Sequence, residues 1–178
     1  MRKLIGITLA IFLTSSLLFV TVCAGAGPVD KPLKAKWIGT TYTIGYCPTE
    51  PRTYKVINVG SGVASGPLGS SNFVFVYCVA MDFTDGYGWG IITTANGDKL
   101  HLWITNLALD TSEFPVIKWS EKEEIVGGTG MFENASGGSE SGGTWTSEAD
   151  PFPEMGPPPQ LLLPAQGWVG TTKGVITF

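Results

Sequence analysis

Few side chains of this sequence could carry acid–base or nucleophilic chemistry, and they form no familiar catalytic motif. His101 is the only histidine, so a Ser-His-Asp triad would depend on it, and a metal site built from several histidines is absent. Glu121, Glu123 and Glu124 form the densest acidic group. Glu121 and Glu123 would share one strand face, which allows a carboxylate pair or a hard-cation site. A solvated outer face that discourages mispairing is the favoured interpretation. No catalytic residue, metal or cofactor is therefore predicted.

A glycine-rich stretch, Gly127-Gly128-Thr129-Gly130, is the second feature that could bind a ligand. Nucleotide-binding loops need a following helix whose N-terminus meets the phosphate. Here the stretch continues as Met131-Phe132-Glu133, without Gly-Lys-Ser/Thr and without a helical pattern. The glycines therefore predict a sharp bend or bulge in a strand.

Composition limits the class of protein. The chain has 178 residues and a net charge of -4, which excludes a basic nucleic-acid binder. Its 43% hydrophobic content excludes a disordered chain. With 24 glycines, 12 prolines and only 15% charged residues, it is typical of a turn-rich β protein.

Strand-like runs follow one another through the chain, separated by Gly, Pro, Asn and Asp. Asn96-Gly97-Asp98 predicts a hairpin with a type I′ turn. Residues 73–80 are apolar on both faces, which suggests a strand covered on both sides. The alternating last run needs a partner, because a free edge would aggregate. The predicted strands span residues 36–46, 54–59, 72–83, 89–94, 99–105, 116–126, 143–147 and 168–178.

The predicted fold class is all-β: an eight-stranded antiparallel closed β-barrel preceded by a signal peptide. A barrel of eight strands is filled by side chains or holds one small ligand. The runs are rich in aromatic residues, and a filled core is the favoured alternative. Tyr42, Tyr77, His101 and Trp103 are the candidates for contacting a ligand if the lumen is open.

The N-terminus has the layout of a secretory signal peptide. Arg2 and Lys3 precede the uncharged apolar run 4–22, and Ala24-Gly25-Ala26 supplies small residues for cleavage. We expect a signal peptide at 1–26, a single domain at 27–178, and a secreted or periplasmic protein that meets the membrane only before cleavage. An uncleaved anchor, or a lipoprotein acylated at Cys23, is the alternative.

Two cysteines remain in the mature chain, Cys47 and Cys78, and an oxidising compartment favours a disulfide between them. Such a bond needs Cα atoms about 4.4–6.8 Å apart, which we expect from neighbouring strands. The alternative is two buried thiols.

A proline-rich loop is predicted at 150–166, because proline cannot donate to a strand ladder. Its leucines would pack on the barrel rim. The alternative is a polyproline-type segment that binds a partner.

Several glycine-centred motifs resemble the allene oxide cyclase and dirigent barrel superfamily, in particular its small secreted bacterial members. The likeness covers about residues 63–178 and implies an eight-stranded antiparallel barrel with an apolar lumen. Plant members include cyclases of epoxide-type fatty acid derivatives and proteins that steer phenoxy-radical coupling. The shared Gly-Gly-Thr-Gly-x-Phe lies at 127–132, whereas the Ala-Arg-Gly typical of dirigent proteins reads Ala135-Ser136-Gly137 here. The other motifs that carry the likeness lie at residues 67–70, 95–100 and 174–178.

The function expected from the sequence is non-catalytic binding of a small apolar or aromatic ligand, or of a surface partner. The first alternative is a cyclase- or isomerase-like enzyme, which requires an ionisable group facing a cavity with a perturbed pKa. The second is a structural or assembly protein acting through the proline-rich loop. The sequence leaves the ligand and the oligomeric state open.

Overall fold

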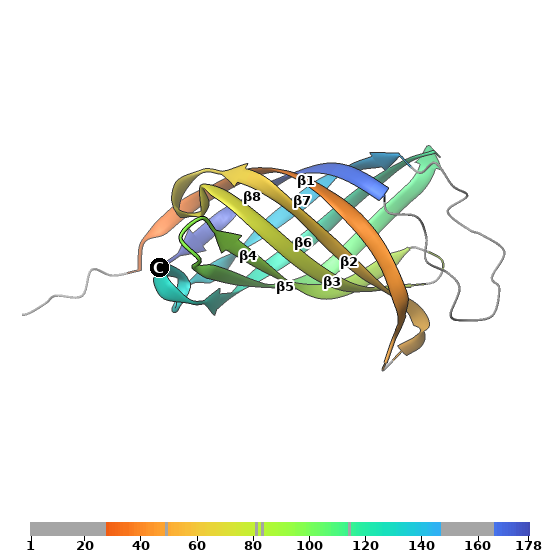
Figure 1. Ribbon diagram of the computed structural model, residues 1–178, viewed down its shortest axis with the longest axis horizontal. Coiled ribbons are helices and arrows are strands. Elements are labelled where there is room, and N and C mark those ends of the chain that lie inside the picture. Colours follow the sequence, from red (N-terminus) through yellow and green to blue (C-terminus); the bar gives the residue numbers. More distant parts are fainter. Residues whose placement is uncertain (1–27, 49, 81, 83, 114, 147–165) are drawn as a thin grey trace, which may run out of the picture.

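Eight strands close into one antiparallel barrel in the computed structural model, which describes residues 28–48, 50–80, 82, 84–113, 115–146 and 166–178. Each strand pairs with its sequence neighbours, and the last pairs with the first, so the described sheet has no free edge (Figure 1). This confirms the predicted all-β fold, an eight-stranded antiparallel closed barrel. The strands are β1 (Asp30–Cys47), β2 (Glu50–Ala64), β3 (Ser70–Ala80), β4 (Asp85–Thr94), β5 (Lys99–Glu113), β6 (Val116–Gly128), β7 (Ser136–Thr146) and β8 (Gln166–Thr177).

Most strands are longer than the sequence pattern predicted. Strand β5 continues to Glu113, and β7 begins at Ser136 instead of residue 143. The added part of β7 is polar and glycine-rich, whereas in β5 the inward Leu107 and Leu109 are out of phase with Leu100, Leu102 and Ile104 because a bulge lies between Ile104 and Asn106. The neighbours of both added segments in the closed sheet pair with their backbone groups, and this pairing overrides the weak local preference.

Alternate side chains along each strand point into the barrel, and aromatic rings fill much of its middle. Trp37 packs edge-on against Phe73 with ring centroids 5.5 Å apart, and Trp168 lies 5.4 Å from the Phe73 ring. The outer face lacks a second layer over β3, where Val74 is 44% exposed. The expectation that residues 73–80 are covered on both sides is therefore wrong: the closed sheet buries one face only.

Inward-facing glycines make room for these rings. A Cβ atom at Gly39 would lie 2.6 Å from the Cζ2 atom of Trp168, and one at Gly170 would lie equally close to Cζ2 of Trp119. Because real Cβ atoms almost never approach so closely, each ring occupies the space that a neighbouring glycine leaves free. Much of the glycine excess thus reflects packing inside the barrel as well as turns.

One end of the barrel is closed by apolar side chains, and we call it the capped end. It lies on the left in Figure 1 and holds the β2–β3, β4–β5 and β6–β7 connections and the C-terminus. Two short 3-10 helices, η1 (Gly66–Leu68) and η2 (Gly130–Phe132), supply Leu68 and Phe132, which are 1% and 0% exposed. The stretch 127–130 ends β6 and begins η2, and Gly127 and Gly130 adopt φ angles of 103° and 59°. The glycines serve a bend, as predicted.

The β4–β5 connection is the hairpin that Asn96-Gly97-Asp98 predicted, with a different turn. The N–H of Gly97 donates to the carbonyl oxygen of Thr94 at 3.0 Å, so Ala95 and Asn96 are the central residues. Gly97 follows the turn with a φ angle of 92°. The loop is therefore a three-residue hairpin loop with glycine in the left-handed position, not a two-residue type I′ turn.

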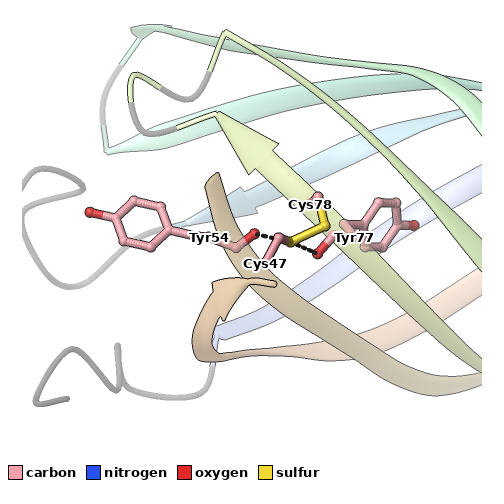
Figure 2. Close-up of a disulfide and its surroundings, with 4 residues drawn as sticks. All are labelled: Cys47, Tyr54, Tyr77 and Cys78. Atoms are coloured by element: carbon pink, nitrogen blue, oxygen red, sulfur yellow. Dashed lines mark hydrogen bonds between the residues drawn. A yellow bond between two sulfur atoms is a disulfide. The ribbon is translucent and has the colours of Figure 1, made fainter. Parts of the chain in front are cut away.

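A disulfide joins Cys47 at the end of β1 to Cys78 in β3, with Cα atoms 5.9 Å apart, which confirms the predicted bond. The two strands are not neighbours, because β2 lies between them. The Cys47 sulfur lies 3.8 Å from the carbonyl oxygen of Tyr54 in β2 and 4.0 Å from that of Tyr77 in β3 (Figure 2). A disulfide sulfur has no hydrogen to donate, so these are close contacts. The bond therefore links β1 to β3 across β2, at the end of the barrel opposite the capped end.

Other predictions fall on residues outside the described ranges. The signal peptide at 1–26, the alternative lipid attachment at Cys23, and nearly all of the proline-rich loop at 150–166 lie there. Among the described residues, no helix is long and apolar enough to cross a membrane.

Candidate ligand site in the barrel lumen

A cavity of about 70 Å³ lies inside the barrel, between its aromatic middle and the end that carries the disulfide. We call this end the cavity end. It holds the β1–β2, β3–β4 and β5–β6 connections, on the right in Figure 1. The cavity is lined by Thr41, Thr43, Val56, Asn58, Tyr77, Val79, Leu107, Leu109, Trp119, Glu121, Trp145 and Trp168. The lumen is therefore filled at the capped end and hollow at the other.

Three residues of the cavity lining each carry a buried polar atom that has no hydrogen-bond partner within the described protein. These atoms are Oε2 of Glu121 and the indole Nε1 atoms of Trp145 and Trp168. A buried polar group without a partner costs about 1–3 kcal/mol, so such groups are normally paired with water or a ligand. The lining residues thus carry two unpaired donors and one unpaired carboxyl oxygen beside apolar walls.

The two acids of β6 face the lumen and not the solvent. Glu121 is 4% exposed and Glu123 is 7% exposed. The favoured interpretation of these residues as a solvated outer face was wrong, and the carboxylate pair left open as the alternative is present. Glu124, the next residue, is exposed on the outside as that interpretation required.

The phase of β6 explains this placement. Ile117 and Ile125 are 3% exposed, and Glu121 and Glu123 have the same odd-numbered parity. The intervening residues Lys118, Ser120, Lys122 and Glu124 are all exposed. Because a strand alternates its faces, the apolar anchors at both ends carry the two glutamates inward.

Glu123 is held by small polar residues of β7. The hydroxyl of Ser141 donates to its Oε1 atom at 2.7 Å, and the hydroxyl of Ser139 donates to Oε2. The single hydrogen of Ser141 is then used, so Thr172 must donate to Ser141 across a 2.5 Å contact. The indole Nε1 of Trp37 donates to Thr172 at 2.8 Å. This chain of donors ends on Glu123 and stabilises a negative charge there.

Glu121 has the opposite character. Burial raises its pKa well above the usual value, and the charge of Glu123 and a hydrogen bond with Glu123 raise that pKa further. Glu121 therefore keeps its proton where an exposed glutamate would lose it. No described lysine is buried, so no cation in the described lumen offsets the pair. Glu121 thus holds its proton beside the carboxyl group of Glu123.

A second chain of hydrogen bonds reaches Glu121 from β1, β2 and β3. The hydroxyl of Thr41 donates to Oδ1 of Asn58 at 2.7 Å, and the Asn58 side chain bonds the phenol of Tyr77. Tyr77 in turn bonds Glu121. Burial, and after it the neighbouring carboxyl pair, raises the Tyr77 pKa well above its usual value, so the phenol stays protonated and donates. Both chains thus converge on the carboxyl pair.

The four predicted ligand contacts separate into one that lines the cavity and three that do not. Tyr77 is 3% exposed and belongs to the lining. Tyr42 and Trp103 are 42% and 45% exposed and lie on the outer face, because the small Thr41 and the apolar Leu102 take the inward positions beside them. His101 is half-buried on the same outer face, between Leu100 and Leu102. Placement in the lumen is therefore corrected for Tyr42, His101 and Trp103.

The remaining site residues were not selected from the sequence. Parity with Ile117 and Ile125 could have placed Glu121 and Glu123 inside. Ser139 and Ser141 gave no such signal, because they lie in the glycine-rich half of β7, where no strand was predicted. Trp145 and Trp168 pair directly across β7 and β8, a contact that only strand register defines.

In comparisons with known proteins, the chain matches no family model, no curated protein and no solved structure. The geometry defines the class of protein: a closed eight-stranded barrel with a small cavity toward one end of its lumen, lined by both apolar and polar residues.

Proposed function

We propose that this protein is a secreted or periplasmic binder that takes the end of a small, largely apolar or aromatic molecule into the cavity end of its lumen. The observation that carries the proposal is the cavity, which combines apolar walls from Val56, Val79, Leu107 and Leu109 with a few unpartnered polar atoms. Small-molecule sites have this composition, since apolar walls give affinity and a few polar atoms fix orientation.

The compartment belongs to the same proposal. The Cys47–Cys78 disulfide is consistent with an oxidising environment outside the cytoplasm. The predicted signal peptide would supply the route there. The barrel is the fold that the allene oxide cyclase and dirigent resemblance implies, and membership in that superfamily stays a proposal.

Affinity for a small probe would be modest. Burying about 200 Å² of apolar surface gains about 5 kcal/mol, and association itself costs at least about 4 kcal/mol. The net gain of about 1 kcal/mol corresponds to a dissociation constant of about 0.2 M. Probes such as toluene, phenol or indole should therefore bind weakly, and NMR titration of the ¹⁵N-labelled protein is suited to detecting such binding.

The test fills the cavity from inside. Val79 lines it and is 4% exposed, so Val79→Phe should abolish binding of every probe. Val74, on the outer face of the same strand and 44% exposed, gives the matched control Val74→Phe, which should bind normally. Thermal unfolding checks that both variants are folded. Unchanged binding in a folded Val79→Phe variant would refute a lumen site.

A second candidate function is a cyclase- or isomerase-like enzyme, and Glu121 is the observation that favours it. It is a carboxyl that lines a cavity, has a raised pKa and bonds a neutral phenol, which suits a general acid. Exchange of deuterium into the carbon next to a ketone carbonyl, followed by NMR in D₂O, tests for proton transfer. Enzymatic exchange should be lost in Glu121→Gln and kept in Glu124→Gln. If no ketone that binds shows exchange, the enzyme alternative is excluded and binding without catalysis remains as the proposed function.

A structural or assembly role through residues 150–166 rests on the sequence pattern alone. Deleting residues 151–164 should leave probe binding unchanged if the lumen carries the function.

A further inference from the structure

We propose that the ligand is a neutral apolar alcohol, whose hydroxyl group accepts a hydrogen bond from an indole N–H of Trp145 or Trp168 and donates one to Oε2 of Glu121. The inference deepens and rests on the proposed lumen binding. It concerns which polar group enters the cavity, and it follows from the three unpartnered atoms of the lining.

The indole N–H groups exclude a ligand whose polar group is a cation such as an alkylammonium. An indole N–H can only donate, so Trp145 and Trp168 each need an acceptor. An alkylammonium group has three donors and no acceptor. It would leave both N–H groups unpaired in a site that offers no other buried partner for them within the described residues.

Glu121 excludes a ligand whose polar group can only accept hydrogen bonds, such as a ketone. Because Oε2 has no partner, the hydrogen bonds of Glu121 with Tyr77 and Glu123 use its other oxygen. With Tyr77 donating to that oxygen and the Glu121 proton held beside the carboxyl group of Glu123, Oε2 remains as a free acceptor. A carbonyl head would place two acceptors against each other there, whereas a hydroxyl supplies the missing hydrogen.

Charge excludes a carboxylate head. Glu123 carries the negative charge of the pair, and no described lysine is buried near it. A second anion in this apolar enclosure would meet repulsion without a compensating cation. A hydroxyl group is neutral and is both donor and acceptor, so it can pair with Glu121 and with an indole N–H without adding charge.

Size fits a small head with an apolar body. The cavity of about 70 Å³ has room for a few water molecules, each needing about 10–15 Å³ on a comparable measure. A ligand that displaces such water must reproduce its hydrogen bonds or lose affinity. A hydroxyl reproduces both the donation and the acceptance of a water molecule.

The experiment titrates the ¹⁵N-labelled full-length protein with four probes of one ring size: cyclohexanol, cyclohexanone, methylcyclohexane and cyclohexylammonium. The indole N–H signals are assigned from single Trp→Phe variants. We expect cyclohexanol to bind tightest, by about tenfold over cyclohexanone, since one lost hydrogen bond with an unpaired group is worth about 1.4 kcal/mol. Cyclohexanol should also move the Trp145 or Trp168 indole signal downfield.

Trp145→Phe provides the matched variant, because it removes a donor while keeping an aromatic ring. We expect it to weaken cyclohexanol binding about fivefold and to leave methylcyclohexane binding unchanged. If Trp168 alone donates, the same pattern should appear in Trp168→Phe instead. Trp89→Phe, at a 45% exposed position on the outer face, should change neither. Thermal unfolding confirms that each variant is folded.

The outcomes separate the two proposals. Equal binding of methylcyclohexane and cyclohexanol, or strongest binding of cyclohexanone or cyclohexylammonium, would overturn the alcohol while leaving the lumen site intact. An unmoved indole signal at cyclohexanol saturation would also overturn it. Failure of all four probes to bind would overturn both the alcohol and the proposed lumen binding.

Discussion

The protonated state of Glu121 predicts an unusual pH dependence of stability, which the variant Glu121→Gln isolates. An unfolded glutamate loses its proton near pH 4.5, whereas burial and Glu123 raise the pKa of Glu121 in the folded protein. Between these two values the folded state binds one more proton than the unfolded state. The stability that this group contributes is fully present below pH 4.5 and is lost as pH rises toward the raised pKa.

The magnitude follows from linkage. One additional bound proton changes the free energy of unfolding by about 1.4 kcal/mol per pH unit. Wild-type protein should therefore lose up to about 2.5 kcal/mol relative to Glu121→Gln between pH 5 and pH 7, as long as the pH stays below the raised pKa. Glutamine stays neutral at every pH, so the variant lacks this slope.

Urea unfolding followed by tryptophan fluorescence at pH 5, 6 and 7 measures the difference. Glu124→Gln is the control, because Glu124 is exposed on the outer face of the same strand, and its curve should run parallel to the wild type. In Glu123→Gln the slope should persist over a shorter pH range, since desolvation, the largest cause of the Glu121 shift, remains. A pH-independent difference between wild type and Glu121→Gln would refute the assignment of the proton to Glu121.

Three further predictions concern the frame around the site. The double variant Cys47→Ser/Cys78→Ser opens a loop with a sequence separation of 31 residues. It should lower the free energy of unfolding by about 3.5 kcal/mol in urea titrations. An unchanged unfolding midpoint would contradict a stabilising role of the disulfide. Gly170→Ala would place a Cβ atom 2.6 Å from Cζ2 of Trp119 and should cost about 1–3 kcal/mol, whereas Gly167→Ala on the same strand meets nothing within 4 Å and should lie within about 0.5 kcal/mol of wild type. Equal effects of the two glycine variants would show that the rings do not depend on the glycine gaps. Ser141→Ala interrupts the donor chain to Glu123 and should cost about 1–3 kcal/mol, while Ser120→Ala on the exposed face of β6 should be neutral; both are measured by the same unfolding assay, and a neutral Ser141→Ala would argue against a charge on Glu123.

The fold could be predicted because hydrophobic alternation and turn residues act locally. The inward Leu100, Leu102 and Ile104 of β5 are 0–2% exposed, as their alternation indicated. Closure could also be predicted, since an alternating terminal strand needs a partner, and β8 pairs with both β7 and β1. The disulfide followed from compartment and count, but its span across β2 depends on how β1 ends beyond its bulges, which no local pattern encodes.

The candidate site was harder to predict because its chemistry contradicts the rule that charged residues face water. Glu121 and Glu123 were assigned to the outside by residue type, although their parity with Ile117 and Ile125 placed them inside. The aromatic residues raised the opposite difficulty: Tyr42 and Trp103 suit a lumen by type but lie outside by phase. Within a strand, phase relative to the buried residues is the stronger indicator, and residue type misleads at the positions where a barrel departs from a plain apolar core.

This departure bears on why the acids are buried at all. A buried polar cluster is often no more stabilising than apolar residues of similar volume, so packing gives no reason for two carboxyls in the lumen. The capped end of the same barrel is closed with Leu68, Leu100 and Phe132, which shows that this chain can fill its interior there without buried acids. Hydrogen-bond donors converge on Glu123, while one oxygen of Glu121 and two indole N–H groups of cavity-lining residues have no partner within the described protein. A cluster serving stability alone would have no need of the unpaired atoms. A lumen with one capped apolar end and a cavity with buried acids at the other is what the proposed ligand binding would require.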